Sequence, residues 1–165
     1  MITLTDTALR TAATQGMDAF LSLFVDAYRE AIGGEPTAET MCLLTADQHT
    51  LLAYAILRDE LSEGGFCQLI QNGYGSYIFH NPFAKVLRAW GLKDLSKLIY
   101  AARQLYDAHC ADLERPRTDE EFMAMYEQYE AFDDLDEEFI ENEEEYTARI
   151  ACYVDEHLDC FAAIA

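Results

Sequence analysis

The chain has 165 residues, of which 31 are Asp or Glu and 11 are Lys or Arg, so its formal net charge is −20. This charge would repel phosphates and anionic lipid headgroups, which argues against direct nucleic-acid binding and against a role at a membrane surface. Hydrophobic residues make up 51% of the sequence, enough for the core of a single domain over residues 1–165. No apolar run approaches the roughly 18 residues that span a bilayer, and the N-terminus lacks a secretion signal, so we expect a cytoplasmic protein.

Helical periodicity dominates the first part of the chain. Apolar residues at helical spacing over residues 20–31 predict a helix, and Gly33 directly after it predicts the helix end. Thr45 and Gln48 have the spacing of a capping box, in which two side chains accept the first unpaired backbone N–H groups of a helix. We therefore expect a second helix to begin there and to stop at the Gly64-Gly65 pair.

The middle of the chain combines glycines with aromatic residues. For residues 66–80 this pattern predicts a short helix followed by a turn, with a minor β-hairpin near 73–80 as the alternative. Pro82 suits the first turn of a further helix. The apolar spacing over residues 95–106 then predicts a longer helix, which the Arg115-Pro116-Arg117 segment should end.

The last third of the chain reads as two or three acidic helices. Thr118 and Glu121 have the spacing of a second capping box, and carboxylates in a first turn also interact favourably with the helix dipole. The elements together predict an all-α protein, a compact single-domain bundle of roughly eight to ten short helices. Within it, residues 118–165 should form an acidic helical surface.

Charge is distributed very unevenly along the chain. Residues 118–165 carry 17 carboxylates and one basic residue, Arg149, for a formal charge of −16, whereas residues 1–117 carry −4. Aromatic and aliphatic residues run through the acidic segment and can anchor it to a core, so the charge would be held on a folded surface. A fixed field of one sign attracts a partner of the opposite sign.

The carboxylate density approaches that of a nucleic acid. Residues 119–145 contain 14 carboxylates in 27 residues, or one per about 3 Å of helix. Duplex DNA has one charge per about 1.7 Å of its axis, and helices that fold back on one another bring the two densities closer. The segment therefore predicts a phosphate-mimicking surface for a basic partner, although a plain solubilising surface would have the same composition. The candidate partner-binding residues are Asp119, Glu120, Glu121, Glu127, Glu130, Asp133, Asp134, Asp136, Glu137, Glu138, Glu141, Glu143, Glu144 and Glu145.

Metal sites find little support in the sequence. Asp133, Asp134 and Asp136 lie close together, but an EF-hand loop needs a glycine at its sixth position and no glycine follows Gly91. We therefore predict no metal site and no cofactor.

Thiol chemistry and catalysis find little support either. The five cysteines are scattered without a Cys-x-x-Cys pair, and we expect them to be reduced and mostly buried. His157 and Cys160 are three residues apart, which by itself is a weak zinc signal. The four histidines lie in no catalytic motif, so we predict no catalytic residues and no enzymatic activity, with a metal-dependent hydrolase as a remote alternative.

A short motif resembles the signature of a known bacterial family. Residues 60–75 read ELSEGGFCQLIQNGYG, which is similar to the Glu-Leu-x-x-Gly-Gly-Phe-x-Gln core of a family classified as a domain of unknown function. This family core covers roughly residues 45–110. With its length and its acidic C-terminal third, the whole chain resembles an acidic, DNA-mimic member of that family.

The resemblance implies a mostly helical homodimer. It also implies a partner: such a protein occupies the DNA-binding face of a helix-turn-helix transcription repressor and competes with operator DNA. No contact residues follow from the signature, so the candidate residues rest on charge density alone. The alternative hypothesis is a non-mimic acidic adaptor or immunity-type interaction module, which would bind through an apolar patch with little dependence on salt.

Overall fold

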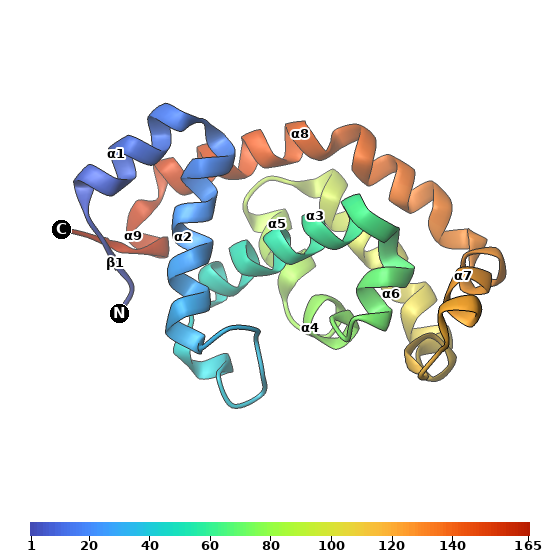
Figure 1. Ribbon diagram of the computed structural model, residues 1–165. Helices are drawn as coiled ribbons and strands as arrows, with labels where there is room; N and C mark the ends of the chain where they lie inside the picture. The colour runs from blue at the N-terminus through green and yellow to red at the C-terminus, as the bar shows by residue number, and fades with distance from the viewer. The chain divides into compact units, whose positions relative to one another are not determined.

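The computed structural model describes residues 1–165, and most of them are helical (Figure 1). Nine α-helices, two short 3₁₀-helices and one pair of two-residue strands confirm the prediction of an all-α fold. The chain forms two compact units: unit 1 consists of residues 1–55 and 144–165, and unit 2 of residues 56–143. The organisation of the chain as a single domain stays a prediction.

Unit 1 contains both ends of the chain. β1 and β2 form a parallel pair in which Thr3 lies opposite Ala163, and Figure 1 shows the N and C labels beside these strands. Sequence periodicity gave no sign of this pair, because two residues per strand are too few to show an alternating pattern. The elements of unit 1 are β1 (Thr3–Leu4), α1 (Asp6–Gln15), α2 (Met17–Ile32), η1 (Met41–Leu43), the first part of α3 (Ala46–Gln71), the last part of α8 (Asp133–Glu156), α9 (Leu158–Phe161) and β2 (Ala163–Ile164).

The core of unit 1 is closed by hydrogen bonds to the end of the chain. Phe24 and Tyr28 of α2 are fully buried, and Gly33 ends this helix in the left-handed conformation, as expected, with φ of 78°. The Tyr28 hydroxyl and the Gln48 side-chain amide both donate to the Phe161 carbonyl, each over 2.9 Å. These two buried polar side chains are therefore paired, and α9 is tied to both α2 and α3.

Helix α3 begins as expected and consists of two helical parts that meet at Gly65. Its capping box is confirmed: the Thr45 N–H donates to Gln48 Oε1 over 2.9 Å, and the Gln48 N–H donates to Thr45 Oγ1 over 3.2 Å. The predicted end at the Gly64-Gly65 pair is confirmed: Gly65 has the non-helical backbone angles φ 71° and ψ −168°, and a second helical part then runs to Gln71. Buried Phe66 at the start of the second part holds that part in the core.

Unit 2 is built around packed aromatic rings. The Phe66 ring lies 6.0 Å from that of Phe79 and 5.7 Å from that of Phe132. Residues 75–79 are helical, so the β-hairpin alternative for 73–80 is wrong; the buried residues Gly75, Ile78 and Phe79 are at helical i, i+3, i+4 spacing, which favours the helix. The elements of unit 2 are the rest of α3, α4 (Gly75–Phe79), α5 (Phe83–Ala89), α6 (Lys93–Glu114), α7 (Asp119–Gln128), η2 (Glu130–Phe132) and the first part of α8.

Two further expectations concern membranes and cysteines. None of the helices combines the length and the apolar character that a bilayer-crossing segment requires. All five cysteines are free thiols, but only Cys67 is buried, so the prediction that most of them are buried is wrong. Cys42 and Cys152 are exposed because they lie on the outer sides of η1 and α8.

Candidate functional site

The outer face of α8 in unit 2 carries a dense group of carboxylates. At 3.6 residues per turn these side chains fall within an arc of about 140° and along about 12 Å of the helix axis. Phe139, on the opposite side of the helix, is fully buried and fixes which face points outward. Five exposed carboxylates form this group, which we call the α8 arc: Asp133, Asp134, Glu137, Glu138 and Glu141.

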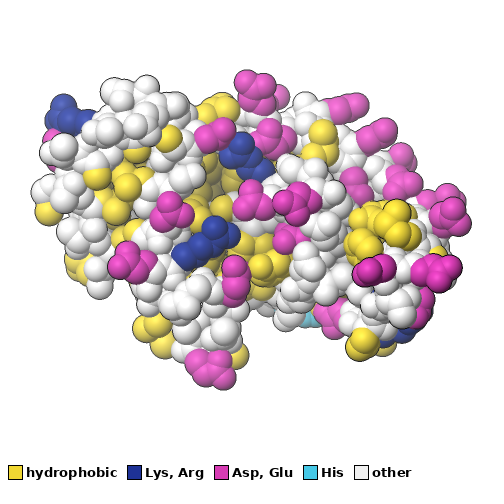
Figure 2. Space-filling model, viewed as in Figure 1, with side chains coloured by type: hydrophobic (Ala, Val, Ile, Leu, Met, Phe, Trp, Pro, Cys, Tyr) yellow, Lys and Arg dark blue, Asp and Glu magenta, His cyan; other side chains and the backbone are white.

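The α8 arc has the charge density of a nucleic-acid strand. It presents one charge per about 2.5 Å of helix axis, compared with about 3.4 Å per charge along one strand of DNA. Figure 2 shows acidic side chains following the course that α8 and α7 take in Figure 1. None of the five carboxylates forms an ion pair within the chain, so their charge is available to a partner.

Helix α7 and the turn after it extend the acidic surface of unit 2. The Glu121 N–H donates to Thr118 Oγ1 over 3.2 Å, which confirms the second capping box and fixes the start of α7. Asp119, Glu120 and Glu127 of α7 are exposed and unpaired, as is Glu130 of η2. Two remaining candidates, Glu144 and Glu145, are exposed on the part of α8 that belongs to unit 1.

Three of the candidate carboxylates have partners inside the chain. Glu121 pairs with Arg115 over 2.9 Å, and half-buried Glu143 pairs with Arg58. Asp136 lies inward and accepts a hydrogen bond from the Phe66 N–H over 2.9 Å. The eleven other candidates are exposed and form no ion pair, so they carry the surface charge.

Asp136 joins α8 to the bend in α3. Its carboxylate receives the first free N–H of the second part of α3, as a capping side chain does. Burial raises the pKa of Asp136 to about 6, the hydrogen bond from Phe66 opposes this shift, and the nearby charge of Asp133 adds to it. Gly65 makes the approach possible, because a Cβ at this position would collide with the carboxylate.

A pH-dependent stability follows from the raised pKa of Asp136. Since its pKa is about 6 in the folded chain and its ordinary value is 3.8, the folded state holds this proton more tightly than the unfolded state does. The stability from this group is therefore complete below about pH 4 and declines as the pH rises towards about 6. We expect Asp136→Asn, which is always neutral and still accepts the Phe66 N–H, to lose that decline and to be at least as stable at neutral pH. Urea unfolding across this pH range measures the effect.

The control for this variant is Asp134→Asn, which removes one exposed carboxylate from the same helix turn. It should leave the decline between about pH 4 and pH 6 in place. An Asp136→Asn protein that unfolds more easily at neutral pH and keeps the decline would contradict the assigned role.

The motif at residues 60–75 forms hydrogen bonds that hold α3 and α7 together. The Tyr126 hydroxyl of α7 donates to the Gly64 carbonyl over 2.8 Å. Within α3 and the turn after it, the side-chain amides of Gln68 and Asn72 donate to Glu60, over 3.0 and 2.8 Å. The motif therefore fixes the α3 bend, to which both α7 and α8 are attached.

Two arginines of unit 2 are held away from the α8 arc. The Arg117 side chain is only 1% exposed, and its Nη2 donates to the carbonyl and the carboxylate of Asp112, over 2.8 and 3.0 Å. Hydrogen bonds from the Tyr129 hydroxyl and from Arg115 lower the pKa of Asp112 to about 2. Sequence reasoning treated this segment only as a helix break. The sequence analysis did not predict that Arg115 and Arg117 form ion pairs with neighbouring residues of the chain. The proximity of Asp112 in the sequence could have indicated these pairs.

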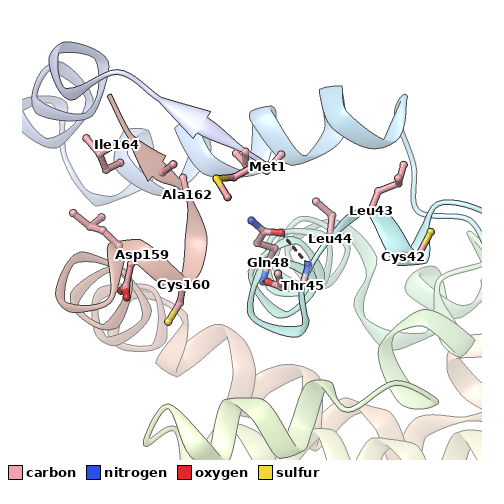
Figure 3. A pocket seen from close by; sticks show the side chains of 13 residues that line it. Met1, Cys42, Leu43, Leu44, Thr45, Gln48, Asp159, Cys160, Ala162 and Ile164 are labelled. Carbon is pink, nitrogen blue, oxygen red and sulfur yellow. Dashed lines mark hydrogen bonds between the residues drawn. The ribbon is translucent and has the colours of Figure 1, made fainter.

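An open groove of about 700 Å³ lies in unit 1 (Figure 3). Its lining is mainly apolar and includes the exposed side chains of Met1, Leu43 and Ile164. Its central polar pair, Thr45 and Gln48, is engaged in the capping box drawn in Figure 3. The groove thus offers a mainly apolar surface; burial and the neighbouring charge of Asp159 raise the pKa of its Cys160 thiol, which disfavours the nucleophilic thiolate.

His157, considered above as a zinc ligand, has a local partner within its own helix turn. His157 Nδ1 lies 2.8 Å from the Tyr153 carbonyl, and the two rings stack with centroids 4.0 Å apart. No three His, Cys, Asp or Glu side chains are arranged to hold a metal ion. The feature that stands out in this structure is therefore the charged surface.

Comparisons with known proteins match most of the chain. A family model described as "DMP19-like protein" matches residues 42–157. Over 151 residues the chain is 34% identical to DNA mimic protein DMP19 of Neisseria meningitidis serogroup B (strain ATCC BAA-335 / MC58), and the alignment covers 91% of each chain. The segment matched by the family model includes the motif at residues 60–75 and all fourteen candidate carboxylates.

Proposed function

This chain belongs to the DMP19-like protein family, and we propose that it is a DNA mimic. In this proposal it binds the DNA-binding face of a helix-turn-helix transcription repressor and keeps the repressor from its operator. The observation that carries the proposal is the α8 arc, whose unpaired carboxylates are spaced along the helix axis at least as densely as phosphates along a DNA strand. Lys and Arg side chains that normally contact phosphates would meet carboxylates instead. The activity is binding alone, and it needs no cofactor.

The hydrogen bonds that anchor α7 and α8 to α3 favour a DNA-mimic function over a surface that only keeps the protein soluble. Asp136 fixes α8 to the bend in α3, and Tyr126 fixes α7 to the same bend. Carboxylates on anchored helices keep their spacing before a partner arrives, which reduces the entropy lost on binding. A surface that served only solubility would gain nothing from such anchoring.

We further propose that the protein acts as a homodimer. A dimeric helix-turn-helix protein contacts two half-sites about 34 Å apart, one helical turn of DNA. A two-fold dimer would present two copies of the α8 arc, one for each DNA-binding domain. The same charge would repel DNA itself, so the protein competes with the nucleic acid without binding it.

A competition experiment tests the proposal. Proteins from a cytosolic lysate are captured on the immobilised chain at low salt, released at high salt, and each purified DNA-binding protein is titrated against its own DNA. We expect a helix-turn-helix repressor that binds at low salt, weakens as salt rises and loses its operator as the chain is added. If the affinity does not depend on salt concentration and the partner stays bound to its DNA when the chain is added, the proposed mimic function is wrong.

The groove of unit 1 favours a second candidate function. Met1, Leu43 and Ile164 expose apolar surface there, as an adaptor or immunity-type module would do. Such binding would depend little on salt and would leave a DNA-binding protein free to hold its operator. The salt series of the competition experiment therefore separates the two functions.

A further inference from the structure

Two large apolar side chains are exposed within the acidic surface of unit 2. Met123 on α7 is 65% exposed, and Ile140 on α8 is 48% exposed. Ile140 follows Glu137 by three residues, so these side chains are neighbours on the helix. Met123 lies within one turn of three exposed carboxylates of α7: Asp119, Glu120 and Glu127. Around α7, Figure 2 shows hydrophobic side chains bordered by acidic ones.

These positions are unusual among the exposed apolar residues of the chain. Met1, Leu43 and Ile164 belong to the groove of unit 1. A single exposed apolar residue on a surface needs no explanation. Met123 and Ile140, by contrast, both occur on the acidic surface, where a purely solvated face would place polar groups.

A carboxylate surface alone reproduces only part of DNA. Contacts to phosphates give affinity that is independent of sequence, and contacts to base edges give selectivity. Recognition helices also read bases through apolar contacts, such as those with the thymine methyl group. A mimic built only of charge would attract every strongly basic protein to a similar extent.

We infer that Met123 and Ile140 are the selectivity contacts of the acidic surface. This inference rests on the proposed function. The two side chains meet apolar groups of the recognition helix of a helix-turn-helix repressor while the surrounding carboxylates meet its Lys and Arg residues. Methionine suits this role because its flexible, polarisable side chain adapts to an irregular partner surface. The partner class is therefore a basic DNA-binding domain with exposed apolar groups among its base-reading side chains.

The test replaces both residues by glutamine, which keeps the volume and removes the apolar surface. Affinity of the Met123→Gln/Ile140→Gln protein is measured over a series of salt concentrations against two probes. These probes are a purified helix-turn-helix repressor that passes the competition experiment and poly-lysine. We expect the affinity for the repressor to fall about 10- to 100-fold at every salt concentration, because apolar burial is not screened. The slope of log K against log salt and the affinity for poly-lysine should stay unchanged.

Tyr100→Gln is the matched control, because Tyr100 is 43% exposed on α6 of the same unit. It should change neither affinity. An unchanged affinity of the double variant for the repressor would overturn the inference and leave the mimic function standing. An equal loss of affinity for poly-lysine would also overturn it, because the substitutions would then have disturbed the charged surface. If the unsubstituted protein binds no such repressor in competition with DNA, the proposed function and this inference both fail.

Discussion

The double substitution Glu137→Lys/Glu138→Lys should weaken binding to the repressor by more than about 100-fold at low salt. Both carboxylates lie on the α8 arc and are exposed and unpaired. Placing lysines there sets like charges against the basic DNA-binding face, which costs several kcal/mol, and each 1.4 kcal/mol is about a tenfold loss of affinity. The dependence of affinity on salt should also become shallower, because fewer charge contacts remain. Titration of the labelled repressor at several salt concentrations measures both effects.

The matched control carries the same change of net charge at another place. Asp26 and Glu30 are two exposed carboxylates of α2, four residues apart, so Asp26→Lys/Glu30→Lys alters the formal charge of the chain equally. This control should lose little affinity. Equal losses for the two double variants would mean that overall charge, and not the α8 arc, attracts the partner.

The substitution Gly65→Ala should lower the free energy of unfolding by more than about 2 kcal/mol. Gly65 has φ of 71° and ψ of −168°, a combination found almost only in glycine and one that costs an alanine roughly 1–3 kcal/mol. In addition, the new Cβ would collide with the carboxylate of Asp136 and displace it from the Phe66 N–H. A buried N–H left without a partner costs a further 1–3 kcal/mol or so. Urea unfolding monitored by circular dichroism measures the change.

Gly16→Ala separates the two causes. Gly16 has φ of 113° and ψ of 175°, in the same region of backbone angles as Gly65, but a Cβ there would meet nothing within 4 Å. It should therefore show the backbone cost alone, about 1–3 kcal/mol. If both variants lose the same stability, the contact between Asp136 and the α3 bend contributes nothing, and its assigned role is wrong.

Local patterns in the sequence were sufficient to predict much of the fold. The capping boxes at Thr45 and Thr118 form as expected because their partners lie three residues away. Charge density also identified a surface on which eleven of fourteen candidate carboxylates are exposed and unpaired. Whether these residues contact a partner stays a prediction.

The remaining features depend on contacts between distant parts of the chain. Asp136 looks like its acidic neighbours in the sequence, yet its hydrogen bond reaches Phe66, 70 residues earlier. Local glycine chemistry predicted the break at Gly65, but it did not predict that Asp136 of α8 would cap the helical part that follows. The periodicity of one helix does not show which of its carboxylates accepts a hydrogen bond from the backbone of another helix.

The pairing of the two ends of the chain has a consequence for synthesis on the ribosome. Unit 2 is one continuous stretch of 56–143, but unit 1 needs residues from both ends, including the strand pair of β1 with β2. Thr3 is made before Ala163 and must wait for it to form the pair. Most of the acidic surface therefore belongs to a stretch that is complete while residues after 143 are still being added, whereas β1 gains its partner only once β2 has been made. Premature termination just before β2 would remove the closing strand from unit 1 and leave every residue of the α8 arc in the chain.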